Sequence, residues 1–290
     1  MKRHIFSILM LFVSLATFAT WQEGDVIYIN GARYIDGTKW DLLGKPIYGD
    51  SILSKTLEAA LPKDRSEVTS NWSGYTAYWS IVKDKLYLDS ICCECYAAAN
   101  KKSYMVNIPS DTLHRIFRKY LDGKRIAATW YKGDIRLGQG PVIYYEHSAY
   151  NRNYKEEQII TIQHGKVTDV KVFHNYMVEG FTLEGFSHSN PTPSDVRKKF
   201  PLHTENYPEL EGVKVIRFHV KDARIDATGH LVECQIDAEV RRDGKSEKVP
   251  ALAAEMTKAM KAIYPWRVYF INGEYRPYGV KGFFIPYRLD

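Results

Sequence analysis

Residues 230–240, read as HLVECQIDAEV, alternate between apolar and polar side chains almost without interruption. Successive side chains of a β-strand point to opposite faces, so this pattern predicts a strand with one buried face and one face in water. The buried face is formed by Val232, Cys234, Ile236, Ala238 and Val240. Residues 213–220, read as VKVIRFHV, predict a strand before it. This part of the chain is therefore expected to form a sheet with one covered face.

A helix is predicted to follow this strand pair. Pro250 suits the first turn of a helix, where its missing N–H costs nothing. Apolar residues then recur at spacings of four, four and three: Leu252, Met256, Met260 and Ile263. This stripe predicts an amphipathic helix that ends before Pro265 and leaves Trp266 to fold over the core.

The chain closes with a turn and another strand. Asn272-Gly273 is a preferred two-residue hairpin turn. One face of the last strand carries Phe283, Ile285, Tyr287 and Leu289. The predicted order over residues 205–290 is strand, strand, helix, strand, strand, which is an α+β arrangement of an antiparallel sheet packed on one or two helices.

This arrangement resembles the C-terminal domain of TonB proteins and their relatives. The likeness rests on TGHL at the turn between the first two strands, the helix PALAAEMTKAMKAI, Pro265-Trp266, Asn272-Gly273 and the closing IPYRL. It implies a small module that binds a partner segment along a sheet edge. The candidate edge residues are Gly282, Phe284, Pro286 and Arg288.

The chain also departs from the TonB pattern. The family spaces its Pro and Trp and adds a second Pro, whereas Pro265 and Trp266 are adjacent here and are followed by Arg267 and Val268. TonB itself has a membrane anchor and a long Pro-rich spacer, which this chain replaces with a β-rich half. The resemblance therefore implies partner binding rather than energy transduction from an inner membrane.

Residues 20–184 are predicted to form a β-rich domain of unknown function. Strand-like runs separated by turn signals fill it, with short helices expected at 51–61 and 110–120 and hairpins at Lys83-Asp84 and Gly165. The stretches 71–81 and 128–138 resemble parts of exported proteins of Bacteroidetes type that have no assigned activity. Ser, Asn and Pro dominate residues 185–195, which places a linker at 185–204 before the TonB-like domain at 205–290.

The first 19 residues predict a secretory signal peptide. Lys2, Arg3 and His4 precede a short apolar run, and the small residues Thr17 and Ala19 stand at the cleavage positions. We expect cleavage after Ala19 and a periplasmic or secreted protein without an integral membrane span. The alternative is an uncleaved membrane anchor. The formal charge of +6 falls to +4 when Lys2 and Arg3 are removed, which is too small and too dispersed to predict a nucleic-acid partner.

The four cysteines are open to four interpretations: a disulfide, a redox site, a metal site and free thiols. Cys92 and Cys95 have the spacing of a C-x-x-C motif, so a disulfide between them, a redox site or half of a metal site is conceivable. The motif stands at a strand end and has no second pair for zinc. A structural disulfide or free thiols are therefore expected, with no metal and no cofactor.

The sequence leaves two functional classes open. The favoured one is a non-catalytic envelope protein that binds a protein partner, with an outer-membrane protein as the candidate. The alternative is a secreted hydrolase or glycan-binding protein whose site lies in the β-rich half. Its candidate residues are the Glu146-His147 pair and the aromatic group Trp72, Tyr75, Tyr78 and Trp79. A catalytic cleft would gather carboxyl groups or histidines with perturbed pKa values, whereas a binding module would offer an open edge or groove.

Overall fold

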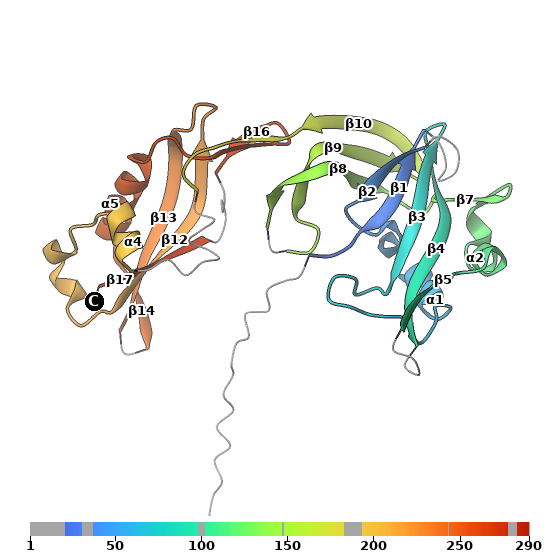
Figure 1. Cartoon of the computed structure of the whole chain (residues 1–290), viewed down its shortest axis with the longest axis horizontal. Coiled ribbons are helices and arrows are strands. Elements are labelled where there is room, and N and C mark those ends of the chain that lie inside the picture. Colours follow the sequence, from blue (N-terminus) through green and yellow to red (C-terminus); the bar gives the residue numbers. More distant parts are fainter. Residues whose placement is uncertain are drawn as a thin grey trace, which may run out of the picture.

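The structure is a computed structural model that describes residues 21–30, 37–97, 102–146, 148–182, 193–242, 244–277 and 283–289. The predicted signal peptide, residues 185–192 of the predicted linker, and Gly282 lie outside the described residues. Figure 1 shows two lobes joined by a narrow stretch of strands. The prediction of a mixed, strand-rich α+β chain is confirmed.

The N-terminal lobe is built on a 10-stranded sheet in the order β10-β9-β8-β2-β1-β3-β4-β7-β6, with β5 paired to β4. Its strands are β1 (Asp25–Ile29), β2 (Thr38–Leu42), β3 (Tyr75–Val82), β4 (Lys85–Ala97), β5 (Lys102–Asn107), β6 (Leu121–Asp122), β7 (Arg125–Ala127), β8 (Gly133–Tyr145), β9 (Arg152–Gln163) and β10 (Lys166–His174). β1 and β3 run parallel. Because β10 also pairs with β4 through Lys166 and Lys85, the sheet curls back on itself (Figure 1).

Two-residue turns fix the hairpins of this sheet. Lys83 and Asp84 join β3 to β4 with positive φ angles of 50° and 58°, and His164 and Gly165 join β9 to β10 with 49° and 76°. Two successive positive φ angles are typical of the type I′ turn, whose twist matches that of paired strands. Both predicted hairpins are confirmed.

Short helices cover part of the N-terminal core: η1 (Pro46–Gly49), α1 (Ser51–Glu58), α2 (Ser110–Ile116) and η2 (Arg118–Tyr120). The Asp50 carboxylate caps α1 by accepting hydrogen bonds from the backbone N–H groups of Ile52 and Leu53. Leu53 and Leu57 are buried, as their spacing predicts, whereas Ile52 is 77% exposed. Ile52 therefore lies on the solvent side of the helix.

The C-terminal lobe contains a 4-stranded antiparallel sheet in the order β14-β13-β12-β17. Its elements are β12 (Val215–Ile225), β13 (Leu231–Arg242), β14 (Lys245–Lys248), α5 (Pro250–Lys261) and β17 (Phe283–Arg288), preceded by η3 (Thr204–Asn206) and η4 (Pro208–Leu210). α5 packs its stripe of Leu252, Met256 and Met260 into the core, as predicted. On β13, Ala238 and Val240 are buried and Cys234 is half-buried, but Leu231 takes the buried place expected for Val232. A break in the register with β12 at this point explains the exchange.

Residues 193–204 do not behave as a linker. α4 (Pro193–Lys199) places Val196 in the C-terminal core together with Phe200. Arg197, Lys198 and Lys199 are exposed on the solvent side of this helix. The C-terminal domain therefore begins before the predicted linker boundary at 204. Two apolar residues spaced four apart, Val196 and Phe200, are enough to dock this short helix on the core.

The two lobes are joined by strand pairing. β10 leads through Asn175 into β11 (Tyr176–Val178), which forms a 3-stranded sheet with β15 (Val268–Ile271) and β16 (Glu274–Arg276). The buried Asn175 side chain donates to the Tyr154 carbonyl at 2.7 Å and accepts from the Asn272 N–H at 2.9 Å. A segment of the N-terminal half thus completes the β15–β16 hairpin of the C-terminal half.

Candidate functional site

The predicted partner-binding strand lies at an edge of its sheet. β17 is the outermost strand next to β12, so one side of its backbone has no neighbour among the described strands. The Leu289 N–H donates to the Lys214 carbonyl at 3.0 Å. Paired residues of antiparallel strands alternate between bonded and non-bonded positions, so Ile285 and Tyr287 direct their backbone groups toward β12. Phe284, Pro286 and Arg288 direct theirs outward.

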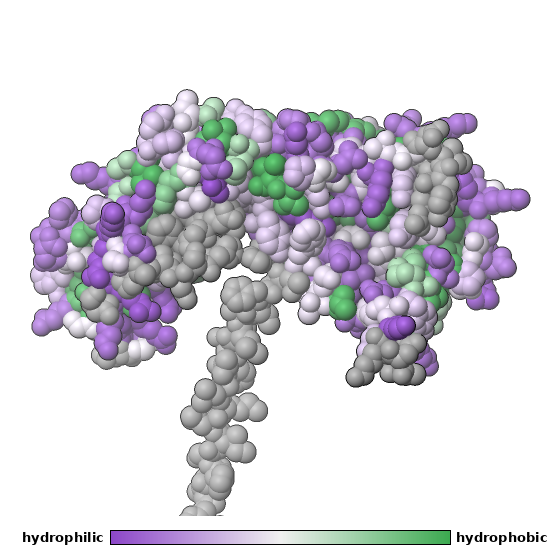
Figure 2. All heavy atoms as spheres, in the orientation of Figure 1, coloured by the Kyte–Doolittle hydropathy of each residue, from purple (hydrophilic) through white to green (hydrophobic). Residues whose placement is uncertain are grey.

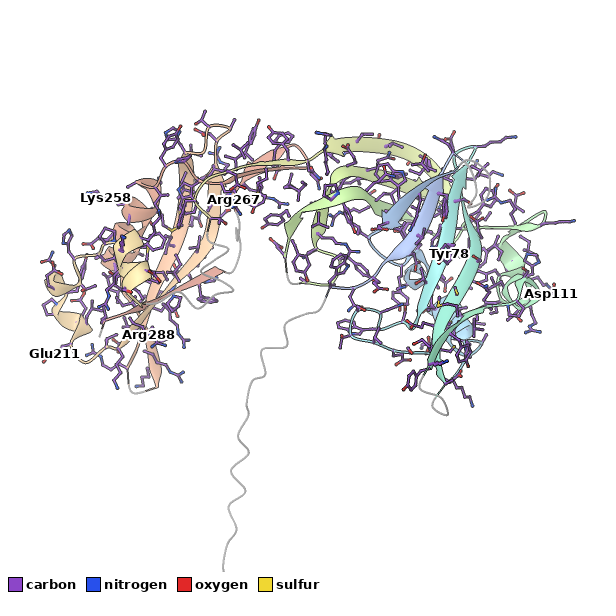
Figure 3. The ribbon with its side chains drawn as sticks, viewed as in Figure 1. Tyr78, Asp111, Glu211, Lys258, Arg267 and Arg288 are labelled. Carbon is purple, nitrogen blue, oxygen red and sulfur yellow. The ribbon has the colours of Figure 1, made fainter. Side chains whose placement is uncertain are left out.

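The side chains of β17 divide in the same way. Ile285 and Tyr287 are buried in the core, whereas Phe284 is 54% exposed and Pro286 and Arg288 are also exposed. The Phe284 ring stacks on His219 with 4.4 Å between ring centroids. Figure 3 shows Arg288 at the end of the lobe away from Arg267, which lies toward the junction. The structure therefore brings Phe284, Pro286 and Arg288 together on one accessible strip.

Pro286 limits the backbone hydrogen bonds that the β17 edge can form with an added strand. Its N–H would be an outward-facing donor, and proline has none. An added strand could pair with both backbone groups of Phe284 and of Arg288, but only with the carbonyl of Pro286. Proline on an edge strand limits indiscriminate strand pairing, so this edge is selective rather than closed.

The open face of the same sheet is basic. A shallow cavity of about 590 Å³ lies over β12 and β13 beside Lys214, Arg217, Glu239 and Arg241. Three cations and one carboxylate leave an excess of positive charge next to the β17 edge. Figure 2 shows hydrophilic side chains spread over the visible face of both lobes, with hydrophobic ones in separate patches. The coloured atoms on this side of the molecule form no single broad hydrophobic patch.

The predicted disulfide is absent from the structure. No disulfide joins Cys92, Cys93 and Cys95 of β4 or Cys234 of β13, and Cys92 and Cys95 stand three residues apart on the same strand. Three steps along a strand separate Cα atoms by about 10 Å and direct the two side chains to opposite faces, whereas a disulfide needs Cα atoms within about 7 Å. The C-x-x-C spacing therefore describes core packing on an extended strand, not a bridge or a redox motif.

These thiols are expected to react slowly in the native protein. Burial raises the pKa of both Cys93 and Cys234 to about 11, and burial also raises that of Cys95. A rise from the ordinary value of 9.0 to about 11 lowers the thiolate fraction at neutral pH by about 100-fold. A thiol-disulfide reagent should therefore modify the native chain slowly and all four cysteines once guanidinium unfolds it. Two thiols missing from the denatured count would contradict the free-thiol assignment.

The aromatic group predicted as a glycan platform does not form one surface. Tyr75 and Trp79 are buried in the N-terminal core, while Trp72 is 63% exposed in the preceding turn. Tyr78, labelled in Figure 3, lies on the opposite face of β3 from Tyr75 and Trp79. Alternation along β3 separates these rings, so the stacking platform expected by the alternative function is reduced to a single exposed indole.

The surroundings of Glu146 do not support the predicted acid–base pair of Glu146 and His147. Glu146 accepts a hydrogen bond from the Tyr144 hydroxyl at 2.8 Å, and His147 lies outside the described residues. The carboxyl groups of the described residues whose pKa values shift are Asp64, Asp122, Glu205, Asp226 and Asp237, and all are lowered. Hydrogen bonds to the charged form cause each shift. A general acid requires the opposite direction.

One polar cluster was not predicted from the sequence. The buried Asp25 carboxylate accepts from Lys45 Nζ at 3.0 Å, from the Ala77 N–H at 3.0 Å and from Trp79 Nε1 at 2.9 Å. Lys45 Nζ also donates to the Tyr75 carbonyl at 2.8 Å. Both carboxylate oxygens and two of the three ammonium donors are bonded within the protein, so the pair ties β1, β3 and the β2–η1 connection together and serves structure rather than chemistry. Its members are distant in sequence and carry no local motif.

The described residues contain no group of three or more His, Cys, Asp or Glu side chains arranged to hold a metal ion. Among them there is also no helix long and apolar enough to cross a membrane. In the comparisons with known proteins, no family model, no curated protein and no solved structure matches this chain.

Proposed function

We propose that this chain is an exported, non-catalytic envelope protein that binds an extended segment of a protein partner along β17, with an outer-membrane protein as the candidate partner. The observation that carries the proposal is the position of β17 as an edge strand, with Phe284 and Arg288 turned outward in both backbone and side chain. Main-chain pairing supplies affinity in this mode, and the neighbouring side chains supply specificity.

The order of elements from β12 to β17 supports the same proposal. β12, β13, α5 and the closing edge strand β17 follow one another as in the TonB C-terminal domain that the chain resembles, with β14 inserted before the helix and β15 and β16 placed in a separate sheet. The basic face beside β17 favours a partner segment with acidic side chains. The N-terminal lobe then acts as a carrier whose strand β11 completes the C-terminal module.

Proline at position 284 tests the role of the edge. Because the Phe284 N–H points away from β12, Phe284→Pro removes an outward donor without breaking the sheet. One net hydrogen bond is worth about 0.5–1.5 kcal/mol, so we expect up to about tenfold weaker binding. The immobilised chain 20–290 would be used to capture proteins from solubilised envelope, with the retained protein identified and its affinity measured. The whole chain is needed because β11 and Phe181 pack on the C-terminal part.

Two matched variants separate the backbone from the side chain. Phe284→Ala keeps the N–H and removes the ring, while Pro286→Ala adds the missing outward donor and is expected to strengthen binding. A partner retained equally by wild type, Phe284→Pro and Pro286→Ala would refute pairing along β17.

A further inference from the structure

The strand β13 has a second uncovered edge. β14 pairs only with residues Glu239 to Arg242 of β13, and the chain then leaves the sheet to enter α5. In the part of the chain that the structure describes, no strand pairs with the same side of β13 before Glu239. Figure 1 shows β14 beside only one end of the sheet.

One hydrogen bond shows which residues of β13 direct their backbone N–H and carbonyl groups toward this edge. The Val249 N–H donates to the Ala238 carbonyl at 2.9 Å, so Ala238 directs its backbone groups toward the β14 side. With alternation every second residue, Ile236 and Cys234 direct theirs to the same side, beyond the end of β14. Gln235 and Asp237 direct theirs toward β12. Four backbone groups of Cys234 and Ile236 thus stand at the uncovered edge.

A cavity of about 440 Å³ lies along these residues. Its lining includes all five consecutive residues from 234 to 238, whose side chains alternate between the two faces of the sheet. A cavity that touches both faces of a strand must follow its edge, because β12 fills the other side. Small residues of α5, namely Ala253, Ala254 and Thr257, form the opposite wall. The result is a groove between an edge strand and a helix, and we call it the β13–α5 groove.

Positive charge exceeds negative charge at the groove. Asp237 pairs with Lys221 at 2.5 Å and with Lys248 at 3.3 Å, and both lysines line the cavity. Two ammonium groups therefore share one carboxylate. An acidic side chain entering on this face would complete the pairing, whereas a basic one would be repelled.

We infer that the β13–α5 groove binds an extended segment of another protein, in which apolar side chains facing α5 alternate with acidic side chains facing Lys221 and Lys248. The segment lies beside β13 in line with β14, and it pairs with the N–H and carbonyl groups of Cys234 and Ile236. The small side chains of α5 leave room for its apolar residues. This inference goes beyond the proposed function, because the groove lies on the other side of the sheet from β17 and does not depend on it.

The test uses the chain 20–290 and a hexapeptide that alternates valine with glutamate. Amide hydrogen exchange measured by NMR should show about tenfold protection at Cys234 and Ile236 when the peptide is added. The amides of Gln235 and Asp237, which already face β12, should not change. Ala254→Trp fills the groove and should raise the Kd at least about tenfold, while Ala251→Trp, exposed on the same helix outside the groove, should leave it unchanged. A peptide alternating valine with lysine should bind about tenfold more weakly.

Several outcomes would overturn the inference. Equal binding by the Ala254→Trp and Ala251→Trp variants, or no protection at Cys234 and Ile236, would exclude the groove. Protection at Phe284 and Arg288 instead would place the peptide on β17, which supports the proposed function and refutes this site. A chain that is dimeric in ultracentrifugation and becomes monomeric in Ala254→Trp would show that a second copy occupies the groove.

Discussion

Asp25→Ala is expected to lower the free energy of unfolding of the N-terminal lobe by about 3–5 kcal/mol. The substitution leaves the Lys45 ammonium buried without its carboxylate and removes the acceptor of the Ala77 N–H and of Trp79 Nε1. An unpaired charge in the interior costs far more than the pair contributes. Urea unfolding followed by far-ultraviolet circular dichroism measures the change.

Two variants make this prediction specific. The exposed ion pair between Lys85 and Asp122 provides a control, and Asp122→Ala should change the unfolding midpoint far less. The double variant Asp25→Leu with Lys45→Met removes both charges and should recover part of the loss, since apolar replacement of a buried pair is often tolerated. If Asp25→Ala unfolds no earlier than Asp122→Ala, the buried pair does not hold β1 and β3 together.

Trp266→Ala is expected to cost the C-terminal lobe about 3–5 kcal/mol. Trp266 is 1% exposed, packs edge-on against Phe181 with 4.9 Å between centroids, and donates from Nε1 to the Met260 carbonyl at 3.1 Å. Its backbone N–H donates to the Gly229 carbonyl at 2.9 Å. Removing the indole opens a cavity between α5, the β12–β13 turn and the segment after β11.

Neighbouring aromatic residues serve as controls for Trp266. Tyr264 is 60% exposed two residues earlier, so Tyr264→Ala should have little effect on the same transition. Trp266→Phe keeps most of the packing and loses the Nε1 donor, and its cost should fall between the other two. Equal unfolding midpoints for Trp266→Ala and Tyr264→Ala would show that the indole is not a core residue.

Local signals predicted much of the secondary structure correctly. Asn272 and Gly273 have φ angles of 53° and 87° and join β15 to β16 by a two-residue turn, as their residue types require. The α5 stripe is buried because helical spacing alone brings its members to one face. Such features depend on residues within a few positions of one another, so no knowledge of the rest of the chain is needed.

The candidate site was predicted in part. The sequence placed Phe284, Pro286 and Arg288 on one face of the closing strand, and their exposure agrees with that face being open to solvent. It did not show that Pro286 removes an outward donor, because the direction of a backbone N–H depends on which neighbour the strand chooses. The groove along β13 was missed for the same reason.

The sequence by itself determined the turns, the helical stripe and the alternation of β13 from Cys234 to Val240. Only the tertiary structure decided which strands stand at edges, that β11 from the N-terminal half joins β15, and that Asp25 meets Lys45. The physical reason is the range of the interactions. Turn type and side-chain periodicity arise from backbone sterics over a few residues, whereas strand neighbours and buried ion pairs arise from the competition of many distant contacts for one packed arrangement.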